Sequence, residues 1–391
     1  MKIGCLVAGM ALAAGLSWGS FAQDSSEPQV LGRVQADFLI EISGVVASRQ
    51  NPGVLWVHND SGGDNAIYAL DLHGRLLGIY RLAGSRNRDW EDIAIGPGTD
   101  SLSWVVYVGD IGDNSRTRAT KIIYRVPEPH VDTTQVTVDT TLYDVDRIVF
   151  AYPDGVHNAE TLMVDPKTAD IYVANKSSIT TLYRVPRDAQ FSPTPTLRVD
   201  TLEVVAHLLF GTAVAGDIDV ESREMLIKNY SRVFGWSRGD TQTWAEALSV
   251  RYHFWPYRKE PQGEAICWTA DGKGYLTISE GVHPKIYYYR PALTGLRFSG
   301  QRTPSAAVLR ATWLSGREKL EATIRLPAFG PWEVRILNVR GREIVSRTVE
   351  AGMWGEHRVQ FSTAGWSSGV YLVQLKLRGK IFKTQRVVVV R

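Results

Sequence analysis

Short apolar runs separated by polar turns fill residues 29–291, and the same arrangement of runs occurs five times. Each copy has an apolar first strand, a turn, a second strand, a polar loop and a third strand. The clearest copy contains DWEDIAIG, SWVVYVGD and KIIYRVP as its three strands. The five copies cover residues 41–74, 89–129, 158–188, 214–240 and 262–291.

Further strand-like segments lie between the copies, and we expect them to be the outermost strand of each unit: RLLGIYRL, DRIVFAYP, TLEVVAHLLF and ALSVRYHFW. Four antiparallel strands repeated every 40–60 residues or so are typical of a β-propeller. The fifth unit lacks its outer strand, whereas Gln29–Leu39 is a spare strand at the start. We therefore predict an all-β protein with a five-bladed β-propeller closed by its first strand. Six blades are the alternative, because residues 131–157 and 189–213 are long enough to contain irregular strands; no segment shows a helical period.

The two ends of the chain differ from this repeat. Residues 1–22 have a lysine, an apolar stretch and the small-x-small sequence Ser20-Phe21-Ala22, which predict a secretory signal peptide. We assign 23–300 to the propeller, 301–311 to a linker and 312–391 to a small Ig-like β-sandwich. Residues 310–391 carry a net charge of +9 within a chain of +3, so the preceding residues are acidic.

Composition excludes several classes of protein. The basic residues of the last domain are scattered along strands and are not clustered with aromatic residues, so we do not expect nucleic-acid binding. No segment after the signal peptide is apolar enough over sufficient length to cross a bilayer. Only Cys267 remains after signal removal, which predicts a buried thiol and no disulfide. We expect a monomer.

Acidic residues recur where inner strands begin and where second strands end, and a propeller brings both positions to one opening on its axis. The expected ligand-binding residues at this opening are Asp60, Glu91, Asp92, Asp110, Asp113, Glu160, Lys176, Asp217, Lys228, Glu264 and Glu280. Crowded carboxylates raise one another's pKa or recruit a cation. Lys176 and Lys228 are candidates for part of that compensation.

A hard, oxygen-liganded ion is the other candidate, and Ca²⁺ is the cofactor that these residues suggest. Its expected ligands are Asp110, Asp113, Glu160, Asp217 and Glu264, although GDIGDN lacks the spacing of a known calcium loop. The alternative is that the acids accept backbone amides and hold the blades together. Motifs for serine hydrolases, zinc peptidases and phosphate loops are absent, and no catalytic residue is assigned. A transition-metal site that uses His58, His157 and His283 is a further alternative.

VLWVHNDSG, DWEDIAIGP, VYVGDIGDN and IYRVPEP resemble motifs of exported bacterial β-propeller proteins without an assigned activity, over about residues 40–190. The repeated Glu-Ala and Asp-Ile strand starts are similar, more distantly, to phytase-like and SdiA-regulated propellers. This second resemblance implies hydrolase chemistry only loosely.

NVRGREI, FSTAGWSSGVYLVQL and the final RVVVVR resemble the type A C-terminal sorting domain of type IX secretion, with Gly341, Gly369 and Tyr371 in register. Ig-like caps of the FlgD type are the alternative. The resemblance implies that residues 312–391 contact the type IX machinery. It also implies export through the periplasm to the surface or surroundings of a Gram-negative bacterium.

These observations favour a secreted propeller that binds a glycan, peptide, small molecule or cation at its acidic mouth. The second hypothesis is an extracellular metal-assisted hydrolase of phosphoesters or lactones that uses the same carboxylates. The third is a purely structural role.

Overall fold

The computed structural model describes residues 27–98, 103–134, 137–186, 189, 191–193, 200–250, 252–290, 308–314, 318–325, 330–351, 356–377 and 380–390. The predicted signal peptide lies outside these residues, as does most of the predicted linker. The described chain is all-β apart from one short helix, as the sequence predicts.

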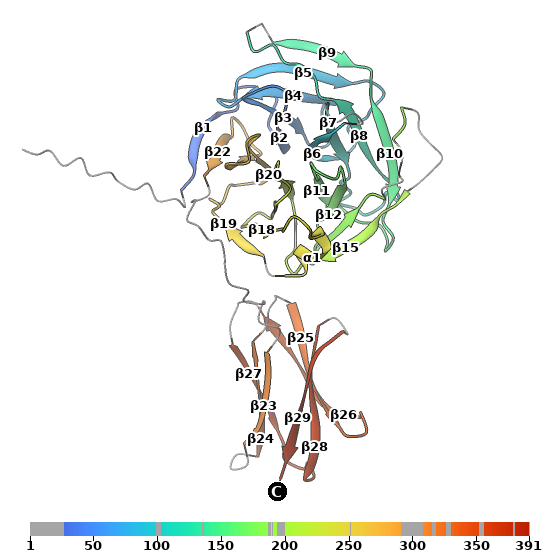
Figure 1. Cartoon of the computed structure of the whole chain (residues 1–391), viewed down its shortest axis with the longest axis vertical. Coiled ribbons are helices and arrows are strands. Elements are labelled where there is room, and N and C mark those ends of the chain that lie inside the picture. The colour runs from blue at the N-terminus through green and yellow to red at the C-terminus, as the bar shows by residue number, and fades with distance from the viewer. Residues whose placement is uncertain are drawn as a thin grey trace, which may run out of the picture.

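Residues 29–289 form five mainly antiparallel sheets, numbered here in chain order (Figure 1). Sheet 1 contains β2 (Ile42–Ala47), β3 (Val54–Asn59), β4 (Ala66–Asp71), β5 (Leu76–Leu82) and β9 (Val138–Leu142). Sheet 2 contains β6 (Trp90–Pro97), β7 (Trp104–Asp110), β8 (Lys121–Pro127), β10 (Asp146–Ala151) and β14 (Asp200–Thr201). Sheet 3 contains β11 (Ala159–Val164), β12 (Ile171–Asn175), β13 (Thr181–Arg184) and β15 (Glu203–His207).

Sheet 4 contains β16 (Ala215–Ile218), β17 (Glu224–Lys228), β18 (Val233–Ser237) and β19 (His253–Trp255). Sheet 5 contains β20 (Gly263–Trp268), β21 (Tyr275–Ser279), β22 (Lys285–Tyr289) and, as its outermost strand, β1 (Gln29–Arg33). The first three strands of every sheet lie within the five predicted copies. The pairing of β1 with β22 confirms the predicted closure by the N-terminal strand.

The sheets stand around a common axis (Figure 1). Their inner strands contact one another in a closed cycle: β2, β6, β11, β16, β20 and back to β2. Each pair of neighbouring sheets shares one apolar cluster; Trp56 and Trp90, for example, pack between sheets 1 and 2. Every residue of β2, β11 and β20 is buried, which explains why the inner strands are apolar runs and do not alternate. This arrangement is that of a β-propeller.

The segments 131–157 and 189–213, which left room for a further blade, contribute outer strands to existing sheets. β9 pairs in parallel with β5, and β14 pairs in parallel with β10. The expectation of no helix is wrong at one place, because α1 (Trp244–Leu248) precedes β19. A capping box between Thr243 and Glu246 begins this helix.

The C-terminal part is a β-sandwich. Its first sheet contains β23 (Val308–Leu314), β24 (Lys319–Arg325) and β27 (Glu356–Ser362). Its second sheet contains β25 (Gly330–Asn338), β26 (Glu343–Ala351), β28 (Gly369–Leu377) and β29 (Lys380–Val389). Leu320 and Phe361 of one sheet and Trp332 and Val373 of the other belong to the same core. β23 begins inside the predicted linker, because it pairs along its whole length with β24.

Nothing helical in the described ranges has the length and apolar character that a membrane span requires.

Candidate functional site

Four of the five inner strands begin with an irregularity in pairing, and this feature positions the acidic side chains. The register shifts lie between Ile42 and Gly44, Trp90 and Asp92, Ala159 and Thr161, and Gly263 and Ala265. The residues between these pairs are Ser43, Glu91, Glu160 and Glu264. A β-bulge redirects the side chain of the extra residue. Three glutamates and one serine are thereby placed at equivalent points around one end of the axis, which we call the mouth.

Three carboxyl groups lie closest together at the mouth: Asp60 after β3, Asp89 before β6, and Glu91 in the β6 bulge. One oxygen from each lies within 4.8 Å of the other two. Among the described residues, this is the group of three or more His, Cys, Asp or Glu side chains that could hold a metal ion. We call these three residues the acidic triad.

Backbone contacts fix the triad. The Asp60 amide donates to the Glu41 carbonyl (2.8 Å), and the Ser43 hydroxyl donates to the Glu91 carbonyl (2.6 Å). Gly112 lies against the triad, and a Cβ at this position would lie 2.1 Å from Glu91 Oε1 and 2.6 Å from Asp89 Cγ. Only glycine therefore allows the β7–β8 loop to approach the two carboxyl groups this closely.

Among the described residues, no cation pairs directly with the triad, although the charges of Arg118 and Lys121 lower the pKa of Asp89 against the larger effect of burial. Burial and then the charges of Asp89 and Glu264 raise the pKa of Asp60 to about 6, and burial raises the pKa of Asp89. Burial and then the charges of Glu160 and Asp60 raise the pKa of Glu91 well above its usual value. Within the part of the chain that the structure describes, no lysine or arginine forms an ion pair with these three residues. The triad is therefore strained electrostatically unless protons or a cation bind there.

The other half of the mouth contains its own cation. Lys176 Nζ lies 2.6 Å from Glu160 Oε1 and donates to the Tyr230 hydroxyl (2.9 Å). The Tyr230 hydroxyl in turn donates to Glu264 Oε1. Burial remains the largest influence on Glu160 and raises its pKa to about 7, although Lys176 opposes it. The second oxygen of Glu160 is buried without a hydrogen-bond partner.

Glu280 completes this half of the mouth. Burial and a hydrogen bond with Glu264 raise the pKa of Glu280 to about 9, so this carboxyl group keeps its proton at neutral pH. The structure thus brings together Asp60, Glu91, Glu160, Lys176, Glu264 and Glu280 from the residues that the sequence predicts.

Two predicted acids lie below the mouth and accept backbone amides. Asp92 accepts from Ile93 of its own strand (2.9 Å) and from Leu162 of sheet 3 (2.8 Å). Asp217 accepts from Ile218 (2.8 Å) and from Trp268 of sheet 5 (2.8 Å). Both oxygens of each carboxylate therefore accept backbone amides, one within the strand and one from the neighbouring blade, and the expectation that Asp217 is a metal ligand does not fit this arrangement.

Asp110 and Asp113 are paired with cations of their own loop. Asp110 lies 2.7 Å from Arg118, and Asp113 lies 3.0 Å from Lys121. Burial alone raises the pKa of Asp113, but the amides of Thr117 and Arg118 and the Lys121 ammonium lower it to about 2. These two aspartates are therefore poor candidates for the metal ligands that the sequence suggested.

Lys228 is fully buried beneath the mouth and donates to the Gly263 carbonyl. Burial lowers its pKa to about 8, with Glu260 and Glu264 opposing. The three histidines are separate: His58 packs on Trp90 in the core, His157 pairs with Asp154, and His283 pairs with Asp37. They do not form a transition-metal site.

Sequence reasoning missed Asp89 and Tyr230. Asp89 precedes Glu91 by two residues in Asp-Trp-Glu, so the two-residue period of a strand places both on one face. Tyr230 stands two residues after Lys228, in the loop position from which the other mouth residues come. Its hydroxyl carries no charge, and a search for charged residues passes over it.

Comparison with known proteins gives one match to a family model and several solved structures. Residues 319–390 match the model described as a secretion system C-terminal sorting domain. The comparison with curated proteins found no match.

Three of the similar solved structures are remote. A nidogen/laminin complex is 13% identical with a TM-score of 0.36, over 78% of this chain and 79% of that chain. The Cps50 (Swd1) β-propeller domain from Myceliophteria thermophila is 9% identical with a TM-score of 0.35, over 68% and 100%. PorZ, an essential surface component of the type-IX secretion system of Porphyromonas gingivalis, is 12% identical with a TM-score of 0.32, over 89% and 51%. At these scores the likenesses carry no argument about function.

The match at residues 319–390 agrees with the expected type IX sorting domain, which acts through the secretion machinery. The chain is therefore a β-propeller protein that a C-terminal sorting domain directs to the surface or the surroundings of a Gram-negative cell.

Proposed function

We propose that this exported propeller is a binding protein whose acidic triad holds a divalent cation, with Ca²⁺ as the best fit. The observation that carries the proposal is the 4.8 Å limit on the distances between one oxygen each of Asp60, Asp89 and Glu91. Calcium binds oxygen at 2.3–2.6 Å, so ligands on opposite sides of the ion lie about 5 Å apart. Three carboxylates within that distance can share one ion.

Two neighbouring groups support the same site. The Ser43 hydroxyl lies 3.4 Å from Glu91 Oε2, and the unpartnered Glu160 oxygen is buried in the adjoining half of the mouth. Calcium commonly takes six to eight oxygens, the remainder from water or from a ligand. A glycan, peptide or small molecule that supplies oxygens to the ion is the ligand we propose for the mouth.

We also propose five blades, with domain limits at 23–300 for the propeller and about 308–391 for the sandwich, preceded by a signal peptide at 1–22. The closed cycle of five inner strands supports the count.

Calcium titration of the metal-free full-length protein tests the proposed site. We expect about one Ca²⁺ per chain by calorimetry, and a loss of affinity of at least about tenfold in E91Q and D89N, because each variant removes one charged ligand. D271N changes an exposed turn aspartate outside the mouth and serves as the control. Wild-type protein that binds no Ca²⁺, or E91Q that binds it as tightly, would refute the proposal.

A second candidate, metal-assisted hydrolysis of phosphoesters or lactones, is favoured by one observation. Glu280 carries a proton at neutral pH beside Glu264, which is an arrangement suited to a general acid. Turnover of p-nitrophenyl phosphate or a simple lactone that stops with EGTA, returns with Ca²⁺ and is lost in E280Q would support it. Calcium binding without turnover of either substrate leaves the binding role.

A further inference from the structure

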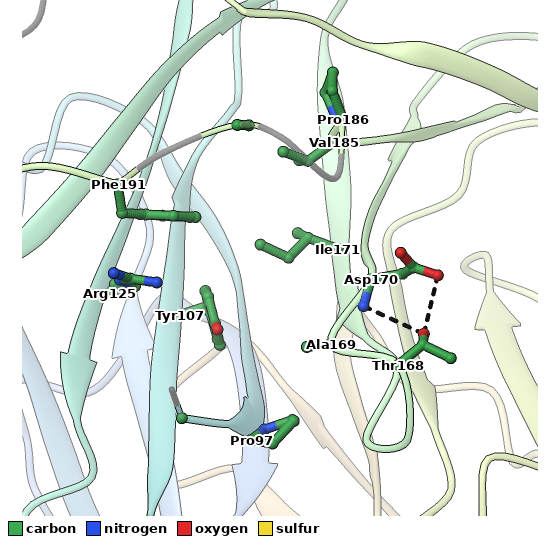
Figure 2. A pocket seen from close by; sticks show the side chains of 12 residues that line it. Pro97, Tyr107, Arg125, Thr168, Ala169, Asp170, Ile171, Val185, Pro186 and Phe191 are labelled. Atoms are coloured by element: carbon green, nitrogen blue, oxygen red, sulfur yellow. Dashed lines mark hydrogen bonds between the residues drawn. The ribbon is translucent and has the colours of Figure 1, made fainter. Parts of the chain in front are cut away.

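A cavity lies between sheets 2 and 3 (Figure 2), at the opposite end of β6 from Glu91. β6 begins beside Glu91 at the mouth and ends at Pro97, which lines this cavity. Six residues of strand separate the two points by about 20 Å. The cavity of about 320 Å³ is therefore independent of the acidic triad, and it lies at the lower end of the roughly 300–1,000 Å³ range of small-molecule sites.

One wall of this cavity is aromatic. Tyr107 and Phe191 meet edge to face with ring centroids 6.0 Å apart, and the Arg125 guanidinium lies 4.3 Å from the Phe191 centroid. Ile171 of β12 and Val185, which directly follows β13, face this wall across the cavity (Figure 2). A ligand with an apolar face can pack against these rings.

The Arg125 charge at the aromatic wall is compensated. Arg125 donates from Nε and Nη2 to Asp146 Oδ2 (3.1 and 2.9 Å), so its charge is already compensated. This pair uses two of the five N–H groups of the guanidinium, and Arg125 also hydrogen-bonds the Tyr107 side chain, which leaves further N–H groups for a ligand. The Thr168 hydroxyl donates to Asp170 (2.9 Å), which turns its carboxylate away from the cavity (Figure 2).

The chemistry of the ligand follows from these walls. An anionic ligand meets no uncompensated cation here, and a purely apolar ligand leaves guanidinium N–H groups without acceptors. A neutral molecule with one apolar face and several hydroxyl groups satisfies both the rings and the Arg125 fork. We propose that this cavity is a binding site for a neutral saccharide of one or two rings, separate from the mouth.

Ligand-observed NMR on the full-length protein tests this site with a panel of neutral disaccharides: maltose, cellobiose, lactose and chitobiose. We expect saturation transfer to at least one of them. The signal should fall at least fivefold in F191A, which removes a ring, and in R125K, which keeps the charge opposite Asp146 but loses the forked donors. F254A removes a partly exposed aromatic ring from β19 outside the cavity and should leave the signal unchanged.

The same NMR measurement on E91Q separates this site from the proposed cation site. Saccharide binding should be unchanged in E91Q and in EGTA, even if the triad binds no calcium. Circular dichroism of each variant checks folding. The proposal is overturned if no saccharide in the panel shows transfer to the wild type, or if folded F191A and R125K bind as the wild type does.

Discussion

At the scale of single residues, the mouth collects more carboxyl groups than its cations can neutralise. Lys176 compensates Glu160, whereas Asp60, Asp89 and Glu91 have no ion-pair partner among the described residues. Burial, and after it the charges of neighbouring carboxyl groups, raise the pKa values of Asp60, Glu91 and Glu160. A folded protein that holds carboxyl groups in this way binds more protons than its unfolded chain does, and its stability depends on pH accordingly.

The sign of this dependence can be tested. The pKa of Asp60 is raised from 3.8 to about 6 and that of Glu160 from 4.5 to about 7. Their contribution to stability is therefore present at acid pH and is lost as pH rises through about 4–7. Calcium replaces the lost protons, so it should stabilise the protein at pH 8 and have little effect at pH 5.

Thermal melting with saturating Ca²⁺ or with EGTA measures this linkage. At a hundredfold excess over the Kd, we expect the melting temperature to rise by about 3–6 °C at pH 8 and by less than about 1 °C at pH 5. E91Q should show neither increase. An equal calcium effect at both pH values would mean that the triad carboxyl groups do not bind the ion.

At the scale of elements, buried acids join the blades to one another. Asp165, directly after β11, accepts from the Trp244 indole of α1 (2.9 Å) and lies 3.0 Å from Arg238. The Ser222 hydroxyl also donates to Asp165. One carboxylate thus holds three side chains of the next blade, in the same way that Asp92 and Asp217 hold backbone amides.

Removal of this carboxylate should be costly. D165A leaves Arg238 with an uncompensated, largely buried charge and Trp244 without an acceptor, and we expect a loss of about 3–5 kcal/mol in the free energy of unfolding. D271A, at an exposed turn of sheet 5, should cost less than about 1 kcal/mol. Denaturant unfolding of both variants gives the comparison, and equal stabilities would contradict the role of Asp165.

Most of the strands could be predicted from the sequence, because the five copies share one order of apolar runs and polar turns. Equivalent apolar runs are then buried at equivalent positions in the sheets. The misses have local causes. α1 is too short to show a helical period, although Thr243 and Glu246 form the capping sequence that announces it. The predicted linker includes the first residues of β23, because the pairing of Val308 with Arg325 in β24 cannot be read from composition.

The sequence predicts where the candidate site lies, but it does not predict which hydrogen-bond or ion-pair partner each acidic residue has. Strand order brings the acids to one end of the axis, but each acid's partner depends on the path of its loop. Arg118 and Lys121 fold back onto Asp110 and Asp113, and the bulges turn Glu91 and Glu160 into the mouth. Neither feature has a signal in the order of residues alone.

At the scale of the whole molecule, the propeller closes on itself within residues 29–289, without a strand from the sandwich. Deleting residues 308–391 should therefore leave a folded propeller that the cell keeps in the periplasm. Cell fractionation and protease resistance measure the two properties. Truncated protein outside the cell would show that export does not depend on the sorting domain.

The pairing of β1 with β22 also sets the order in which the protein can be completed. Gln29 is synthesised near the start of the propeller, yet its partner Tyr288 follows about 260 residues later. Contacts between residues this far apart in sequence form slowly, since a long loop must close first. A chain that ends before β22 therefore leaves β1 without its partner strand, and an unpaired strand is a template for pairing with other chains. Synthesis of β22 supplies the missing partner, so completion of the fifth sheet also protects against aggregation.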